Sequence, residues 1–559
     1  MTISSTRRRV LLGLTAAAAW PAGAGRTAAA VSDPAPFLHG VASGDPDATS
    51  VVLWTRVSGA DRPTIVSWEA ARDEAFADAV TAGTVTTDAR RDFTVKVIAR
   101  NLDPGQRYFY RFRMGSVTSR VGRTRTLPAG HIERLGIAVA SCSNYAFGHF
   151  NAYDAIARDP EVEFVLHLGD YIYEYGRDGW GATVAMALGR EHQPPHEIVT
   201  LDDYRIRHAQ YKGDAGARAM HAALPMIPIW DDHESTNNPW MSGAENHQAD
   251  EGDWDSRRRN ALRAYYEWMP IRDPGPHGMR SAYWRHFEFG DLASLITLET
   301  RHTGRSRQIE YAEHLPSLAT RDDAVRFEQE VLAAPDRHML ADEMTAFLRR
   351  ALAGAVAADR PWRLIGNQIP LARVRVPPLH ETPLAARAAD PAYPAAAALA
   401  ELVQLGRLQL PIYLDTWDGY PAAREEFYAA CAASGVTDLL VLTGDSHAFW
   451  ANRLATASGR PMGLELGTAG ISSPGDFERF GSAASSLLDQ RLVAHNPEVV
   501  WTDNTHRGYL RVVLERSVAR ADFVAVSRVD RPEYHSRVLR SDRILRQNGT
   551  LAYGPAEPA

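Results

Sequence analysis

The first part of the chain alternates short β-rich runs with turn signals. The runs cover residues 50–57, 64–71, 93–99, 107–114 and 121–126, with Gly, Pro and Asp between several of them. Short strands at this spacing are typical of a small antiparallel sandwich. We therefore predict an immunoglobulin-like β-sandwich over residues 31–130, ending in a linker at 127–130.

After this linker, apolar runs alternate with helical stretches. The runs cover 135–140, 162–168, 225–230, 292–298, 362–369 and 438–443, and the helical stretches include 257–268, 341–353 and 422–434. This alternation predicts a layered α/β domain with its site at the carboxyl ends of strands. We assign residues 131–530 to this domain and 531–559 to a C-terminal tail. The Ala- and Pro-rich stretch 384–399 is predicted to be a surface excursion.

The first thirty residues have the features of an export signal. They contain four arginines and no acidic residue, and their apolar run at 10–20 is short. A bilayer of about 30 Å needs about 20 apolar residues, so this run is too short to span it. Arg7-Arg8-Arg9 before the run resembles a twin-arginine signal, and the alanines at 28–30 offer a cleavage site. We expect the twin-arginine machinery to deliver a periplasmic or extracellular protein without a transmembrane anchor.

Composition and charge narrow the class of protein further. The chain has 559 residues, of which 45% are hydrophobic and 23% are charged, as in ordinary folded proteins. A net charge of −7 provides no basic field for a phosphate backbone, so we expect no stable nucleic-acid binding. The two cysteines allow at most one disulfide. Cys431 fits core packing in a helix, and a Cys142–Cys431 disulfide is the alternative.

Polar side chains follow five of the predicted strands. The groups are Ser141-Cys142-Ser143-Asn144, Gly169-Asp170-Tyr171-Ile172-Tyr173, Asp231-Asp232-His233-Glu234, Asn367-Gln368 and Gly444-Asp445-Ser446-His447. Taken singly, a Gly-Asp pair is usually a turn and a buried cysteine is usually core packing. Together, at the carboxyl edge of one sheet, they would bring several negative charges close together, and cations would have to neutralise them. The sequence therefore predicts a site for more than one metal ion.

The types of ligand divide between two kinds of metal. Three candidates suit a transition ion: Cys142, Tyr173 and His447. Three others offer oxygen ligands for a hard ion such as Ca²⁺ or Mg²⁺: Asp232, Asn367 and Asp445. Asp170 is the natural bridge between the two ions. Such a pair could clamp a phosphoryl group and deliver a metal-activated hydroxide, with His233 placed to contact the substrate or protonate the leaving group.

Read in order, these motifs resemble the calcineurin-like metallophosphoesterase superfamily. Gly-Val-Ala-Ser-Gly-Asp-Pro at 40–46, Trp-Asp-Asp-His-Glu at 230–234 and Asp-Gly-Tyr-Pro at 418–421 are similar to the PhoD-type alkaline phosphatase D family in particular. The resemblance extends from about residue 37 to about residue 509. It implies an α/β/β/α sandwich and an exported phosphatase and phosphodiesterase that acts on small phosphate esters.

The resemblance also implies a centre of Fe³⁺ and Ca²⁺, with other divalent ions as alternatives. The implied iron ligands are Cys142, Asp170, Tyr173 and His447. Asp170 would bridge to a calcium also held by Asp232, Asn367 and Asp445, and Asp170 and His233 are the implied catalytic residues. Where Asp would be expected, this chain has Glu299, and Arg301 two positions later either steers phosphate or forms a structural ion pair.

The sequence leaves two other functions open. One is an extracytoplasmic phospholipase-type phosphodiesterase, which would use the same ions. The other is a non-catalytic protein that binds phosphate esters, against which the complete set of seven candidate ligands argues. A different class of ester hydrolase is disfavoured, because we find no Gly-x-Ser-x-Gly nucleophile elbow between a strand and a helix.

Overall fold

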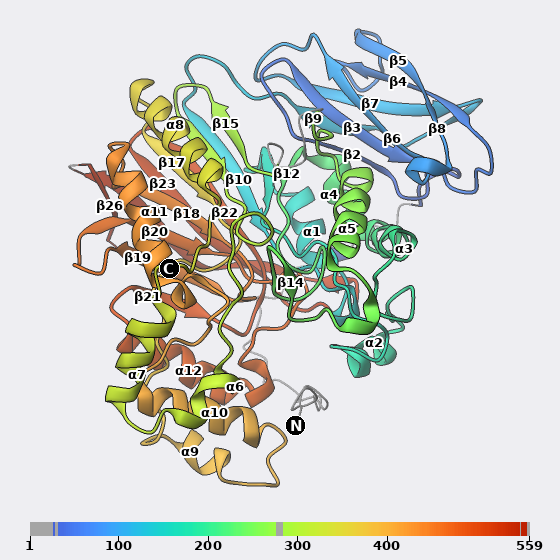
Figure 1. Cartoon of the computed structure of the whole chain (residues 1–559). Coiled ribbons are helices and arrows are strands. Elements are labelled where there is room, and N and C mark those ends of the chain that lie inside the picture. Colours follow the sequence, from blue (N-terminus) through green and yellow to red (C-terminus); the bar gives the residue numbers. More distant parts are fainter. Residues whose placement is uncertain (1–25, 28–31, 276–282, 548, 556–559) are drawn as a thin grey trace.

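The structure is a computed structural model, and it describes residues 26–27, 32–275, 283–547 and 549–555 (Figure 1). The predicted export signal lies almost wholly outside these residues. Within it, β1 (Arg26–Thr27) pairs antiparallel with β24 (Glu533–Tyr534) near the other end of the chain.

The N-terminal region is a sandwich of two antiparallel sheets, as predicted. One layer contains β2 (Val41–Gly44), β3 (Ser50–Arg56) and β6 (Thr94–Arg100). The other contains β5 (Ala79–Thr87), β4 (Thr64–Ala71), β7 (Arg107–Met114), β8 (Val117–Thr118) and β9 (Gly122–Arg125). Apolar side chains of both layers, such as Leu53, Val66 and Phe112, form the core between them.

One layer of this sandwich continues into the sheet of the following domain. Gly44 at the end of β2 pairs in parallel with Met226 of β12 (Met226–Pro228). A Cβ at Gly44 would lie 2.4 Å from the Met226 carbonyl oxygen and 2.5 Å from that of Pro270, so only glycine fits here. The sandwich is therefore joined to the larger domain through a sheet as well as through its linker.

The larger domain contains two sheets packed face to face. The ten-stranded sheet has the order β26-β25-β23-β22-β10-β11-β12-β2-β3-β6, and the seven-stranded sheet has the order β15-β16-β17-β18-β20-β19-β21. The strands of the first sheet not yet located are β10 (Arg134–Ala140), β11 (Phe164–His167), β22 (Arg507–Glu515), β23 (Val518–Val526), β25 (Ser536–Gln547) and β26 (Thr550–Tyr553). Those of the second are β15 (Arg285–Phe289), β16 (Ala293–Thr297), β17 (Trp362–Gly366), β18 (Leu439–Thr443), β19 (Phe449–Ala455), β20 (Pro461–Gly467) and β21 (Val499–Asp503).

Alternation along the strands separates the inner core from the helix-covered faces. On β10, Leu135, Ile137 and Val139 point into the core between the sheets, whereas Ala138 and Ala140 face outward. The outer face of the ten-stranded sheet is covered by α1 (Asn151–Ala157), α3 (Leu201–Lys212), α4 (Ala215–Ala223) and α5 (Trp254–Trp268). The other outer face is covered by α8 (Asp342–Ala357) and α11 (Pro421–Ala433). The predicted α/β/β/α sandwich is confirmed.

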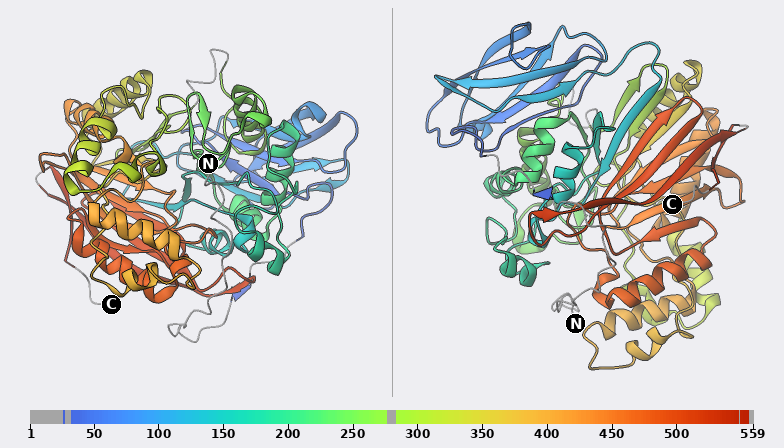
Figure 2. Two further views of the ribbon diagram at one scale, coloured as in Figure 1. Left: turned by 60° about the horizontal axis from the view of Figure 1, so that its bottom comes forward. Right: turned by 180° about the vertical axis from the view of Figure 1, so that it is seen from behind.

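A separate group of helices lies at the end of the molecule opposite the N-terminal sandwich (Figures 1 and 2). It contains α6 (Tyr311–His314), α7 (Arg321–Phe327), α9 (Pro383–Ala388), α10 (Ala396–Leu408) and α12 (Ser482–His495). The stretch 384–399, predicted as a surface excursion, supplies part of this group. Leu384 and Leu399 are buried in its core, so the prediction missed two packed helices.

The last residues of the chain belong to the ten-stranded sheet. β25 (Ser536–Gln547) pairs antiparallel with β23, and β26 (Thr550–Tyr553) pairs with β25. The prediction that residues 531–559 form a separate tail is therefore corrected, because β25 and β26 belong to the sheet. The many arginines of β25 conceal the strand in the sequence, because it lies in an edge region where most side chains are exposed or half-exposed.

Candidate metal centre

The predicted ligands follow strands of both sheets. Cys142 follows β10, Asp170 and Tyr173 follow β11, and Asp232 follows β12 in the ten-stranded sheet. The others follow strands of the seven-stranded sheet: Asn367 follows β17, and Asp445 and His447 follow β18. The expectation of one sheet edge was wrong, because the site lies where the carboxyl ends of strands from two facing sheets meet.

Four of these residues have an unusual backbone conformation. The φ angles are 61° at Cys142, 56° at Asp170, 61° at Asp445 and 55° at His447. A left-handed backbone costs a residue with a side chain of the order of 1 kcal/mol or more, and such strain collects at functional sites. The sharp turn after each strand brings the ligand atoms of these side chains close together at the ends of the strands.

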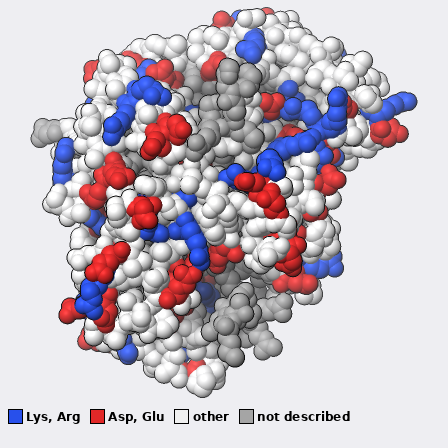
Figure 3. Space-filling model, in the orientation of Figure 1, with Lys and Arg blue, Asp and Glu red and all other residues white. Residues whose placement is uncertain are grey.

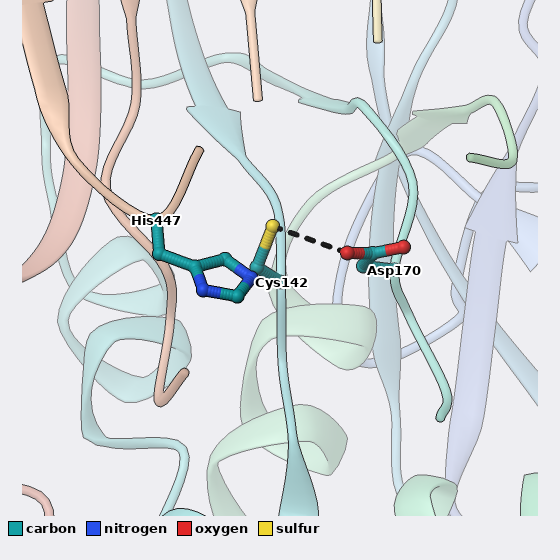
Figure 4. A group of neighbouring side chains, drawn as sticks. All are labelled: Cys142, Asp170 and His447. Atoms are coloured by element: carbon teal, nitrogen blue, oxygen red, sulfur yellow. Dashed lines mark hydrogen bonds between the residues drawn. The ribbon is translucent and has the colours of Figure 1, made fainter. Parts of the chain in front are cut away.

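The first group of candidate ligands surrounds the thiol of Cys142. Potential ligand atoms of Cys142, Asp170 and His447 lie within 4.8 Å of one another (Figure 4). The Cys142 Sγ lies 3.4 Å from Asp170 Oδ2, and Tyr173 Oη lies 3.1 Å from the same oxygen and 3.3 Å from His447 Nε2. The structure thus brings together all four side chains for which an iron site was expected.

Two further groups continue from the first. Asp170, Asp232 and His233 form one, and Asp231, Asp232 and Asp445 form the other, each again within 4.8 Å. Asp170 belongs to the first and second groups, and Asp232 belongs to the second and third. The donors therefore form a continuous series with Asp170 between its two ends. Asp231 was not among the predicted ligands.

Asn367 belongs to the same edge but has different contacts. It is fully buried after β17, the neighbour of β18 in the sheet. Its Nδ2 donates to the Ile369 carbonyl at 2.6 Å, and the Trp417 indole lies 3.5 Å from its Oδ1. The three groups contain only His, Cys, Asp and Glu, so they do not include this amide.

The electrostatics of the site favour bound cations. Burial, followed by the neighbouring Asp170 carboxylate, raises the pKa of Cys142 and of Tyr173 well above the usual values. Burial, followed by Asp232, raises the pKa of Asp170 in the same way. Asp231 Oδ2 and Asp232 Oδ1 are buried with no hydrogen-bond partner among the described residues. Such oxygens and thiols are what a metal ion would satisfy, so the residues fit a polymetal centre.

His233 is held by an acidic partner. Its Nδ1 lies 2.7 Å from Glu174 Oε2, and its Nε2 lies 3.9 Å from Asp232 Oδ2. Burial alone would lower the pKa of His233, but the Asp232 and Glu174 carboxylates outweigh it and raise this pKa to about 9. Glu174 is itself fixed by the Asn237 backbone amide at 2.9 Å and Asn246 Nδ2 at 2.8 Å. His233 is therefore oriented as a proton donor beside the carboxylates.

Glu234 connects two of the loops that carry ligands. Its carboxylate accepts hydrogen bonds from the backbone amides of Asp170 at 3.1 Å, Tyr171 at 2.6 Å and Asp231 at 2.8 Å. Sequence reasoning assigned this residue no role, although it stands inside the Asp-Asp-His-Glu motif. Its position directly after the histidine was the available signal.

The structure decides two alternatives that the sequence leaves open. Arg301 has no exposed surface and pairs with Asp231 and Asp445, which favours the structural ion pair over phosphate steering. Both cysteines are free, so the disulfide alternative is wrong, and Cys431 is a residue of α11 that packs in the core. Trp180, just before α2 (Ala182–Leu188), stacks on His447 with ring centres 5.6 Å apart.

Acidic and basic side chains are interspersed over much of the face drawn in Figure 3. Within the described part of the chain, every helix is too short or too polar to cross a membrane.

Comparison with known proteins gives consistent matches over nearly the whole chain. The family described as PhoD-like phosphatase matches residues 137–523, and its N-terminal domain family matches residues 22–128. Alkaline phosphatase D of Bacillus subtilis is 34% identical over 513 residues, which cover 89% of this chain and 79% of that protein. A solved structure of PhoD matches with a TM-score of 0.73 and 30% identity over 94% of this chain and 93% of that one. A purple acid phosphatase from yellow lupin matches with a TM-score of 0.53 and 12% identity, covering 91% of this chain and 74% of that one, and so supports the fold alone.

Proposed function

The chain belongs to the PhoD-like phosphatase family and is a metal-dependent phosphoric ester hydrolase, and from this premise we propose that its centre holds Fe³⁺ and Ca²⁺. The family assignment removes the alternative of a non-catalytic binding protein.

We assign the iron to the thiolate end of the donor series and the calcium to the oxygen end. The proposed iron ligands are Cys142, Asp170, Tyr173 and His447. The proposed calcium ligands are Asp170, Asp232, Asn367 and Asp445. Thiolate, phenolate and imidazole suit a transition ion, whereas carboxylate and amide oxygens suit a hard ion. The observation that carries the proposal is that Asp170 belongs to both the Cys142 group and the Asp232 group.

When bound, the two ions supply charge that neutralises phosphoryl oxygens and makes water acidic enough to act as a nucleophile. The remaining steps fall to the protein. Asp170 belongs to both the thiolate end and the oxygen end of the site. Glu234 fixes the loop that carries Asp170 by accepting its backbone amide and that of Tyr171. His233 presents Nε2 beside Asp232, where it donates a proton to the leaving oxygen of the ester. Glu174 stabilises the charged imidazole through Nδ1 until that proton is delivered.

The test is Asp170→Asn, which keeps the size of the side chain and removes its charge. We expect iron and calcium contents, measured by elemental analysis, to fall together with hydrolysis of p-nitrophenyl phosphate. Asp322→Asn, at an exposed position in α7, is the matched control and should leave both unchanged. An Asp170→Asn protein with full metal content and full activity would refute the bridge.

The substrate class is decided by the ratio of kcat/KM for p-nitrophenyl phosphate to that for bis-p-nitrophenyl phosphate. We propose a phosphatase that also accepts diesters, so both esters should be hydrolysed above the level of the Asp170→Asn protein. A ratio well below one would favour the phospholipase-type phosphodiesterase instead.

We also propose that the protein acts outside the cytoplasm after twin-arginine export. The support is the run Arg7-Arg8-Arg9 before a short apolar segment. Cell fractionation of the wild-type chain and of an Arg7→Lys, Arg8→Lys chain tests this. Activity that stays in the periplasm or medium after the double substitution would contradict it.

A further inference from the structure

Arg301 is a buried cation among the carboxylates at the proposed calcium end of the site. Its Nε donates to Asp231 Oδ1 at 2.5 Å, and its Nη2 donates to Asp445 Oδ1 at 2.7 Å. The same Nη2 lies 3.7 Å from Asp232 Oδ1. These three acids are the members of the third group of potential metal ligands. A single guanidinium therefore contacts every carboxylate of that group.

This guanidinium also connects the two sheets. Arg301 and Asp445 follow β16 and β18 of the seven-stranded sheet, whereas Asp231 and Asp232 follow β12 of the ten-stranded sheet. The fork of an arginine can hold two carboxylates in fixed directions, which a lysine cannot do in the same way. The acids from opposite sheets are thus kept close to each other by a residue of the protein itself.

The loop that carries Arg301 is firmly anchored. The Glu299 carboxylate accepts the backbone amides of Arg301 at 2.9 Å, His302 at 2.7 Å and Thr303 at 2.8 Å. It also accepts the Trp230 indole at 3.2 Å. Because its backbone is fixed and its side chain is fully buried, Arg301 stays with the carboxylates and is not available to bind a substrate from solvent.

At this end of the site, the negative charges of the carboxylates outnumber the positive charges of the protein. Ionised Asp231, Asp232 and Asp445 carry three negative charges. Arg301 supplies one positive charge that contacts all three, and the charged imidazole of His233 lies 3.9 Å from Asp232 alone. Like charges at such distances repel strongly in a buried environment. One arginine offsets part of this repulsion and leaves enough negative charge to attract a divalent ion.

We propose that Arg301 is an internal counter-cation that holds the three carboxylates together before the hard ion binds and that weakens the affinity of the site for that ion. The inference rests on the proposed metal centre. It makes Arg301 a positioning residue, since it touches ligands of the metal and not the substrate.

The test compares the stability of variants with and without Ca²⁺. Protein is stripped with a chelator, and the melting temperature and Ca²⁺ affinity are then measured with CaCl₂ as the only added metal. Arg301→Gln should lower the melting temperature of the stripped protein more than that of the Ca²⁺-loaded protein. It should bind Ca²⁺ about tenfold more tightly or better, because the repulsion between the two cations is gone. Arg301→Lys keeps the charge and should bind Ca²⁺ within about threefold of wild type.

Two controls separate this role from a purely structural one. Arg363 is also a buried arginine paired with an acid, 2.9 Å from Asp438, but it lies at the opposite end of the strands. Arg363→Gln should lower both melting temperatures equally and leave Ca²⁺ affinity unchanged. The charge-balanced double variant Arg301→Gln, Asp231→Asn should regain stripped-state stability relative to Arg301→Gln and return to within about threefold of the wild-type affinity.

The outcomes are distinct. Equal losses of stability with and without Ca²⁺, or weaker Ca²⁺ binding by Arg301→Gln, would overturn the role of Arg301 alone. If Arg301→Gln yields no folded protein, the same measurements are made on the double variant Arg301→Gln, Asp231→Asn. Failure of the double variant to fold would also overturn the inference. Wild-type protein that shows no Ca²⁺-dependent shift would overturn the proposed calcium site, and this inference with it.

Discussion

At the scale of single residues, the pair of Glu174 and His233 leads to a prediction for catalysis. Glu174→Gln removes the charge beside His233 Nδ1 but keeps the size of the side chain. We expect kcat to fall about 10- to 100-fold, because the imidazole is less well held in its charged form, with KM and metal content little changed. Steady-state kinetics and elemental analysis check this, with the exposed Glu330→Gln as control. Unchanged kcat would show that Glu174 has no part in proton transfer.

Most of the candidate site can be predicted from the sequence, because the ligands directly follow apolar strands. This pattern selects Cys142, Asp170 and His447, and the structure brings them together. The roles of Arg301 and Glu234 depend instead on which loops meet in space. The sequence does not show that the loop after β16 brings Arg301 to the carboxylates after β12 and β18, or that Glu234 reaches the backbone after β11.

Glu234 leads to a prediction for stability. Glu234→Gln leaves a single acceptor oxygen for the backbone amides of Asp170, Tyr171 and Asp231. A buried amide without a partner costs about 1–3 kcal/mol, so we expect a loss of this order in the free energy of unfolding. Denaturant unfolding of the variant measures it. A loss near zero would mean that the three amides find other acceptors, and the loops would then not depend on this carboxylate.

At the scale of elements, the sequence predicts the strands that have an apolar pattern and misses those that lack one. The predicted strands 64–71 and 107–114 coincide with β4 and β7, and the run 135–140 differs from β10 by one residue. β5 was missed, since its small and polar residues carry no apolar pattern and most are exposed or half-exposed. β25 was missed because arginines and serines fill an edge region of the sheet. In both cases pairing with a neighbouring strand decides the structure.

The position of β26 leads to a prediction for truncation. Ending the chain at Gly549 removes β26, with its buried Leu551, and exposes the edge of β25. We expect a lower melting temperature and faster aggregation, because an unpaired strand edge pairs with other molecules. Ending the chain at Gly554 keeps β26 and is the control. If both truncations behaved like the full chain, residues 550–553 would act as the dispensable tail that the sequence indicated.

At the scale of the whole molecule, removing metal should affect activity and stability together. Chelation leaves the buried carboxylates around Asp170 without neutralising ions, so we expect hydrolysis to stop and the melting temperature to fall by several degrees. Adding back iron and Ca²⁺ should restore both, whereas the same ionic strength of KCl should not. Differential scanning calorimetry and an activity assay measure this on one sample. Full activity after exhaustive chelation would refute the metal dependence of the site.

The division of the donors between two sheets has a consequence for the synthesis of the protein. Cys142 and Asp170 leave the ribosome long before Asp445 and His447, which follow a strand late in the chain. No nascent chain that ends before β18 can contain a complete centre, however well its first half has folded. Assembly of the complete set of candidate ligands is thus a late event, and enzymatic activity indicates that the early and late parts of the chain have folded together.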